Sequence, residues 1–114
     1  MCRLVKLYED KAICVADIKR DHVLNMVECA KDCNEIDKIV LFGSALESRC
    51  TNDSDIDVAI VGSLQRCRFN KSKGYLSFRE RVYSYDFEQE YDMLYFKGIV
   101  GDIASNGVVI YSKR

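Results

Sequence analysis

The sequence has no proline, a single histidine and almost no excess of either charge. With 17 Lys and Arg against 18 Asp and Glu, the formal net charge is −1, so bulk electrostatic attraction to nucleic acid or to a membrane surface is not expected. The N-terminal segment MCRLVKLYED has the pattern of neither a secretory signal nor a membrane span, and we therefore expect a cytoplasmic protein. The absence of proline has no functional interpretation that the sequence supports.

Six cysteines are present, yet their spacing favours neither disulfides nor zinc. No Cys-x-x-Cys pair occurs, and Cys29 and Cys33, four residues apart, lack the histidine or second pair that would complete a zinc site. The one histidine, His22, is interpreted as a structural or surface residue of a helix. In a reducing cytosol we expect all six thiols to be free. They are Cys2, Cys14, Cys29, Cys33, Cys50 and Cys67.

The length of 114 residues, with 48% apolar and 31% charged residues, fits one soluble globular domain covering 1–114. Short β-branched segments alternate with amphipathic ones, which predicts an α/β (α+β) domain with helices packed around a small sheet. Asp17 is the expected N-cap of the first helix, and a hairpin turned at Glu9–Asp10 is expected before it. The expected helices cover 18–33, 45–50, 73–85 and 98–105, and the expected strands cover 38–42, 55–61, 90–96 and 108–112.

Three carboxylates stand directly before the apolar run Val58–Val61. Side chains alternate along a strand, so Asp55 and Asp57 face the same side, roughly 7 Å apart at about 3.3 Å per residue. Two such carboxylates repel unless a cation lies between them, and oxygen ligands that leave positions open suit Mg²⁺ or Mn²⁺. Asp53 belongs to the preceding turn and is interpreted as a solvated or outer acid. A solvated Asx turn before an edge strand is the alternative interpretation of an isolated Asp-x-Asp.

The residues around this acidic segment favour a phosphate-binding metal site. Gly43-Ser44 lies where a strand ends and a helix is expected, so backbone amides and the Ser44 hydroxyl can hold phosphate oxygens. Asp92, in the middle of a later strand, is a candidate third carboxylate, since an acid there needs a partner. A calcium loop is excluded, because its sixth and twelfth positions would be Val58 and Leu64 instead of Gly and Glu.

A basic stretch follows the acidic one. It contains one acid, Glu80, and two interpretations stay open: a solvated loop and helix surface, or a contact with phosphates or an acidic partner. Its cations are Arg66, Arg68, Lys71, Lys73, Arg79 and Arg81.

The motif spacing resembles a known family. Gly43-Ser44 is followed after ten residues by Asp55-Ile56-Asp57, with Asp92 on a later strand. This pattern is similar to the polymerase-beta-like nucleotidyltransferase superfamily, and specifically to its minimal nucleotidyltransferases, over a core of about 20–111. Residues 1–17 form an N-terminal extension outside that core. The resemblance implies the nucleotidyltransferase fold with a small mixed β-sheet.

The resemblance also implies residue roles. Asp55, Asp57 and Asp92 would be catalytic and hold Mg²⁺ or Mn²⁺, and Gly43 and Ser44 would bind the phosphates of ATP or another nucleoside triphosphate. Two further candidates for phosphate contact are Arg49 and Ser54. Many relatives carry Arg-Gly shortly after Gly-Ser, where this chain has Glu47-Ser48 and then Arg49, and a common proline is replaced here by Asn52. These departures bear on phosphate affinity and nucleotide choice.

Minimal nucleotidyltransferases are often paired with HEPN-domain toxins, which implies a function for this chain. It would transfer a nucleoside monophosphate, AMP from ATP, to a hydroxyl of a partner protein, namely a tyrosine of a HEPN-domain toxin, and so act as an antitoxin. Direct binding of nucleic acid is not expected. Two alternatives remain: transfer to a small-molecule or RNA acceptor with a separate substrate-binding subunit, and an antitoxin that acts by binding alone.

Overall fold

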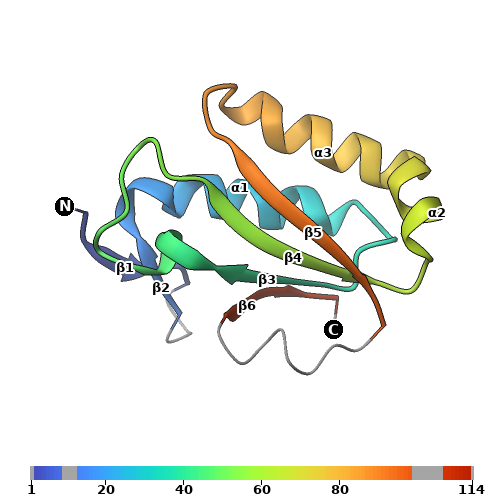
Figure 1. Ribbon diagram of the computed structural model, residues 1–114, viewed down its shortest axis with the longest axis horizontal. Coiled ribbons are helices and arrows are strands. Elements are labelled where there is room, and N and C mark those ends of the chain that lie inside the picture. The colour runs from blue at the N-terminus through green and yellow to red at the C-terminus, as the bar shows by residue number, and fades with distance from the viewer. Residues whose placement is uncertain (1, 9–12, 99–106, 114) are drawn as a thin grey trace.

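The computed structural model describes residues 2–8, 13–98 and 107–113. Its centre is a four-stranded mixed sheet in the order β5-β4-β3-β6, seen in Figure 1. β3 pairs antiparallel with both β4 and β6, whereas β4 and β5 run parallel. This confirms the expected α/β domain with a small mixed sheet. The strands are β3 (Lys38–Phe42), β4 (Ile56–Gly62), β5 (Tyr91–Lys97) and β6 (Val108–Ser112).

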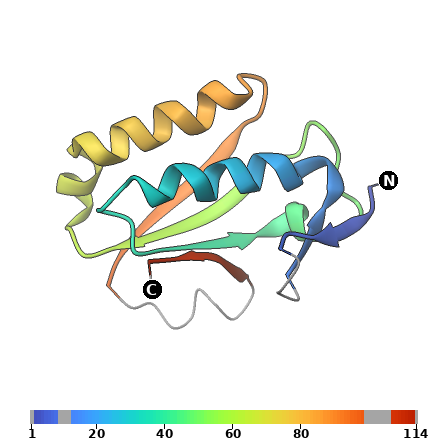
Figure 2. The ribbon, with the colours of Figure 1, turned by 180° about the vertical axis from the view of Figure 1, so that it is seen from behind.

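Two long helices, α1 (Arg20–Lys31) and α3 (Lys73–Tyr85), lie side by side on one face of the sheet, as Figure 2 shows. Every second residue of the strands points to these helices, and the apolar stripe of each helix meets them. The opposite face carries the alternate residues and is not covered by either helix. The core joins Ile39, Leu41, Ile56, Val58, Ile60, Tyr91 and Tyr95 of the sheet to Val23, Met26, Val27 and Ala30 of α1 and Phe78 and Val82 of α3.

An N-terminal hairpin precedes the first helix, as expected. β1 (Leu4–Lys6) and β2 (Cys14–Ala16) pair antiparallel, and the predicted turn at Glu9–Asp10 lies outside the described residues. The prediction that Asp17 caps the helix is wrong. Asp17 begins a separate 3-10 turn, η1 (Asp17–Lys19), and its carboxylate accepts a hydrogen bond from the backbone amide of Arg3 at 3.2 Å. The side chain is therefore used to attach the N-terminal strand.

Two further elements differ from expectation. The segment expected to be helical over 45–50 is a 3-10 turn, η2 (Gly43–Leu46), which begins earlier and is shorter. A short helix, α2 (Arg66–Lys71), was not expected, since six residues rich in Arg and Lys show little apolar periodicity. The helix expected over 98–105 falls almost entirely outside the described residues. All six cysteines are free, as expected, and no helix within the described ranges is long and apolar enough to cross a membrane.

The helices α2 and α3 form the crossover between the parallel strands β4 and β5, and β5 is an edge of the sheet. Two of its outward carbonyl groups are occupied by side chains of this crossover. The Tyr83 hydroxyl donates to the Tyr91 carbonyl at 3.2 Å, and Arg66 Nη2 donates to the Tyr95 carbonyl at 3.3 Å. Such bonds make an exposed edge less available for pairing with another strand.

Phe69 explains why the short helix α2 is stable. Its ring is fully buried and stacks on Tyr95, with the ring centres 3.8 Å apart. We expect Phe69→Ala to lower the free energy of unfolding by about 3–5 kcal/mol, the usual range for a buried phenylalanine. Asn70→Ala, next to it and exposed, should change it by less than about 0.5 kcal/mol. Urea unfolding followed by circular dichroism measures both, and equal losses would contradict the assignment of Phe69 to the core.

Candidate functional site

Asp57 and Asp92 are direct neighbours on the parallel strands β4 and β5. Paired residues of adjacent strands lie about 4.8 Å apart and share a face, which here is the face opposite the helices. Asp57 is half-buried and Asp92 is exposed. Asp55 stands one residue before β4 begins, so it belongs to the end of the preceding loop rather than to the strand. The sheet thus brings together two acids that are far apart in the sequence.

Gly43 brings the end of β3 against the same carboxylate. Phe42 pairs with Asp57, and Gly43 follows with a φ of +74°, a backbone conformation that favours glycine. A Cβ atom placed on Gly43 would lie 2.5 Å from Asp57 Oδ2, so a side chain there would collide with the acid. The structure therefore places Gly43 and Ser44 beside Asp57, in agreement with the spacing of the motif.

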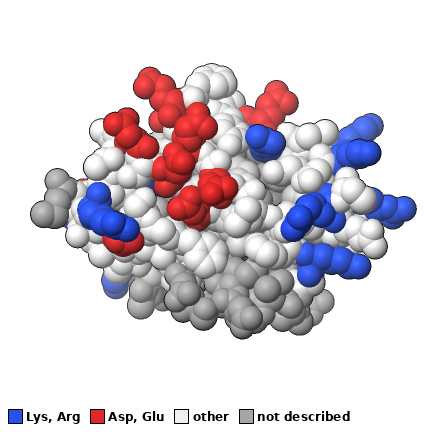
Figure 3. Space-filling model, in the orientation of Figure 1, with Lys and Arg blue, Asp and Glu red and all other residues white. Residues whose placement is uncertain are grey.

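Burial and neighbouring charges act on the Asp57 carboxyl. Burial raises the pKa of Asp57 above its usual range, and the charges of Asp92 and Asp55 raise it further. Among the described residues, no ion pair reaches any of these three acids. Acidic side chains gather in the middle of the face that Figure 3 shows, which is the face away from the helices. This concentration of unpaired negative charge is a physical reason for a cation to bind.

The arrangement fits a magnesium ion that arrives with its substrate. Within the described part of the chain, no three Asp, Glu, His or Cys side chains already form a metal cage. A Mg²⁺ ion does not require one, because it keeps several waters and usually takes one or two carboxylates together with substrate phosphates. Asp57 and Asp92, adjacent and unpaired, are such a set, and Asp55 lies close enough for its charge to act on Asp57.

An apolar cavity of about 240 Å³ adjoins the two acids. Three of its residues, Phe42, Leu94 and Phe96, were not expected to belong to a site. A signal for them exists in the sequence, because Leu94 and Phe96 lie two and four positions after Asp92 and so share its side of the strand. The cavity is lined by Phe42, Asp57, Val58, Ala59, Asp92, Leu94 and Phe96.

Two predicted phosphate ligands have other partners. Arg49 pairs with Glu47 on the surface, where both side chains are exposed and the Nη2–Oε1 distance is 3.3 Å. The Ser54 hydroxyl accepts a hydrogen bond from the backbone amide of Thr51 at 3.0 Å, which folds the loop locally. Their phosphate contacts stay predictions, since phosphate would have to compete with these bonds.

Asp53 lies apart from the paired acids. It lines a second, polar cavity of about 280 Å³, together with Lys19 and Asp86. Its separation from Asp57 agrees with its interpretation as an outer acid.

The first part of the basic stretch lies at the other end of β4, where Arg66, Arg68 and Lys71 are on α2. Figure 3 shows most of the basic side chains of this face at the right, away from the acids in the middle. Arg79, later in the stretch, is on α3 and lines a cavity with Glu90, near the start of β5. Asp57 and Gly62 are five residues apart on the strand, or roughly 17 Å at about 3.3 Å per residue. This distance disfavours contact with phosphates held at Asp57 and leaves a solvated surface or a partner contact.

The raised pKa of Asp57 has a consequence for stability. The ionised carboxyl destabilises the folded state, so stability is lost as the pH rises through the folded-state pKa and is unaffected well below about pH 4. We expect metal-free Asp57→Asn to melt at a higher temperature than the wild type near neutral pH, with the difference shrinking toward about pH 4. Thermal unfolding with EDTA across this range measures it.

The matched control is Asp53→Asn, which removes a negative charge from the loop before β4 but not from the paired acids. It should lack the pH-dependent gain. A metal-free Asp57→Asn protein that is no more stable than the wild type at neutral pH would show that the acids do not repel one another as their positions indicate.

The comparisons with known proteins agree with this geometry. The sequence matches the family "Polymerase beta, Nucleotidyltransferase" over residues 25–114, a segment that contains β3, β4, β5 and every predicted site residue. No individually curated protein matches the chain. The match covers far more than half of the sequence, and it includes the glycine-serine turn and the two strands that hold the acids. The chain therefore belongs to the polymerase beta nucleotidyltransferase family.

Proposed function

We propose that this protein transfers a nucleoside monophosphate, AMP from ATP, to a tyrosine hydroxyl of a HEPN-domain toxin and thereby acts as its antitoxin. Membership of the nucleotidyltransferase family supports monophosphate transfer in general. The observation that carries the proposal is the pairing of Asp57 and Asp92 beside the Gly43-Ser44 turn and an apolar cavity. It supports the proposal because the two acids, the Gly43-Ser44 turn and the cavity adjoin one another.

The residues divide the reaction between them. The Gly43-Ser44 turn would hold the terminal phosphates, because its backbone can approach them without a side chain in between. Asp55, Asp57 and Asp92 would hold Mg²⁺ or Mn²⁺, which when bound neutralises phosphate charge and polarises the α-phosphate. Asp92 would accept the proton of the acceptor hydroxyl. The hydroxyl oxygen then bonds to the α-phosphorus, the bond from that phosphorus to the bridging oxygen breaks, and pyrophosphate leaves.

The cavity beside Asp92 supports an aromatic acceptor. Phe42 and Phe96 present phenyl rings, and Leu94 is more than half exposed at its border. An aromatic ring gains from burial against such residues and from ring–ring contact, and its hydroxyl can reach the acids at the end of the cavity. The resemblance to minimal nucleotidyltransferases that are paired with HEPN toxins adds the identity of the partner.

The acids are tested by transfer of label. The protein is incubated with each α-labelled nucleoside triphosphate, Mg²⁺ and the product of the neighbouring gene, which the proposal expects to be a HEPN-domain protein. We expect label from ATP to appear on a tyrosine of the partner, located by mass spectrometry. Asp57→Ala and Asp92→Ala should slow transfer by roughly 100-fold or more, because even groups that only orient metal ligands are worth about 10–100-fold.

Asp53→Ala is the control, since Asp53 lines the other cavity, and it should keep transfer within about threefold of the wild-type rate. Unchanged transfer by Asp57→Ala or Asp92→Ala would contradict the assigned roles. Label on a small molecule or RNA, with none on the partner, would favour the alternative acceptor class. Full protection from the toxin by the Asp55→Asn, Asp57→Asn double variant would favour an antitoxin that acts by binding alone.

The position of Lys71 and Lys73 in the basic stretch leads to a separate prediction, and we call these two lysines the basic cluster. Neutralising Lys71 and Lys73 should leave the KM for the triphosphate within about twofold, because they lie beyond the far end of β4. The same double alanine variant should weaken partner binding, measured by calorimetry, if the cluster contacts an acidic partner surface. A large rise in the KM for the triphosphate would show that these lysines reach the phosphates.

A further inference from the structure

The loop that carries Asp55 has little structure of its own. It runs from the end of η2 at Leu46 to the start of β4 at Ile56 and contains no helix or strand. Its local bonds are those of short turns, such as the Ser54 amide to the Thr51 carbonyl at 3.0 Å. Asp55 therefore depends on contacts from other elements to remain near Asp57, whose charge repels it.

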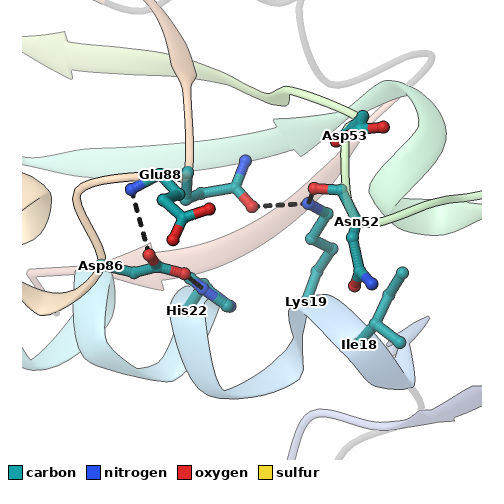
Figure 4. Close-up of a pocket in the computed structure, with 8 residues that line it drawn as sticks. Ile18, Lys19, His22, Asn52, Asp53, Asp86 and Glu88 are labelled. Atoms are coloured by element: carbon teal, nitrogen blue, oxygen red, sulfur yellow. Dashed lines mark hydrogen bonds and ion pairs between the residues drawn. The ribbon is translucent and has the colours of Figure 1, made fainter.

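One such contact comes from a buried lysine. Lys19, at the junction of η1 and α1, is 1% exposed, and its Nζ donates to the Asn52 carbonyl at 3.1 Å. Figure 4 shows its side chain extending from the helix end to Asn52. Its second partner is the Gln89 side-chain oxygen, and among the described residues no carboxylate lies within ion-pair distance of it. Burying an ammonium group that is held only by neutral oxygens costs folding free energy, which suggests that the lysine is retained for a function.

Gln89 connects this lysine to the strands that hold the acids. It is 4% exposed, and its Nε2 donates to the Ser54 carbonyl at 3.1 Å and to the Glu90 carbonyl at 2.7 Å. The Glu90 carbonyl also accepts the Ile56 amide at 3.1 Å, the first bond between β4 and β5. Lys19 and Gln89 thus connect the loop, at Asn52 and Ser54 on either side of Asp53, to the start of β4 and β5. We call this pair the Lys19–Gln89 bridge.

We propose that Lys19 and Gln89 are positioning residues for the metal site: their bridge fixes Asp55 relative to Asp57 and Asp92 against the repulsion of the three acids. The inference rests on the proposed function, because it assigns the bridge a role in metal affinity. Both side chains are buried, and they line the polar cavity and not the apolar one beside Asp92. Without the bridge, the Asn52 and Ser54 carbonyls lose their donors, and the loop moves Asp55 away from the negative charge of the pair.

The test uses Mn²⁺ as the probe, with free Mn²⁺ measured by electron paramagnetic resonance in the presence of ATP. Lys19→Met and Gln89→Met keep side-chain length and remove the bridge. We expect each to weaken Mn²⁺ binding by about 10–100-fold, as for other groups that orient ligands. Hydrogen exchange, which needs no metal, should show faster exchange of the amides of residues 51–55 with α3 still protected. Activity should return at raised Mn²⁺.

Asp86→Asn is the matched control. Asp86 lines the same cavity, and its carboxylate bonds to His22 Nε2 at 2.8 Å and accepts the Glu88 amide at 3.1 Å. Within the described part of the chain, no hydrogen bond or ion pair joins its side chain to residues 51–55. It should keep Mn²⁺ affinity within about twofold. Should Lys19→Met not fold, Gln89→Met decides the question, because it leaves the lysine and its bond to Asn52 in place.

Wild-type Mn²⁺ affinity in a folded Gln89→Met protein would overturn the inference, as would an equal loss of affinity in Asp86→Asn. Unchanged exchange of residues 51–55 would also overturn it. Failure of the wild-type protein itself to bind Mn²⁺ with ATP would contradict the proposed function, and the positioning role with it. Mn²⁺ binding by the wild-type protein thus tests the proposed function. The differences in affinity between the variants test the positioning role of Lys19 and Gln89.

Discussion

Repulsion between the carboxylates of Asp57 and Asp92, held side by side by the pairing of β4 with β5, is the constraint on which the site depends. Parallel pairing fixes the two acids at the spacing of neighbouring strands, and the sheet does not let them separate. Asp55 has no such restraint, because it precedes β4. The loop that carries it accepts hydrogen bonds from Lys19 and Gln89. The protein thus combines a rigid pair with a third acid on an anchored loop.

Successive side chains of each strand point to opposite faces of the sheet, so core residues and candidate site residues lie on different faces. On the helix side, Val58 and Ile60 of β4 enter the core, and on the other side Asp57 and Ala59 face the cavity. A single strand therefore supplies both a packed surface and a reactive one. Gly43 lies beside this second face, because the lack of a side chain lets the turn approach the Asp57 carboxylate. Acids on a strand whose other side is fully packed move little, which favours catalysis by fixed groups.

Most of the sheet and the helix α3 could be predicted from the sequence. β-branched runs such as 38–42 and 108–112 indicate strands. Ser72 caps α3, where its hydroxyl accepts the Tyr75 amide at 3.1 Å. The helix α2 could not, because one buried residue, Phe69, stabilises a segment of otherwise exposed character. The prediction for Asp17 failed because its carboxylate bonds to the backbone of Arg3, just before the N-terminal strand β1.

The residues of the candidate site could be proposed from the sequence, but the strand pairing that brings them together could not. Motif spacing identified Gly43, Asp57 and Asp92, whereas only the strand pairing shows that the two acids are opposite one another. The bridge of Lys19 and Gln89 was not predictable, because it depends on hydrogen bonds between residues distant in the sequence.

The crossover through α2 and α3 has a consequence for the order of folding. Asp57 and Asp92 become neighbours only when β4 and β5 pair, which closes the long chain segment that contains α2 and α3. Long-range parallel pairing carries a large closure entropy and forms slowly compared with local helices. An incompletely folded chain therefore lacks the acid pair even when its helices are present. A ligand that binds this pair and not the unfolded chain stabilises the whole domain, by an amount that grows with its concentration relative to its Kd.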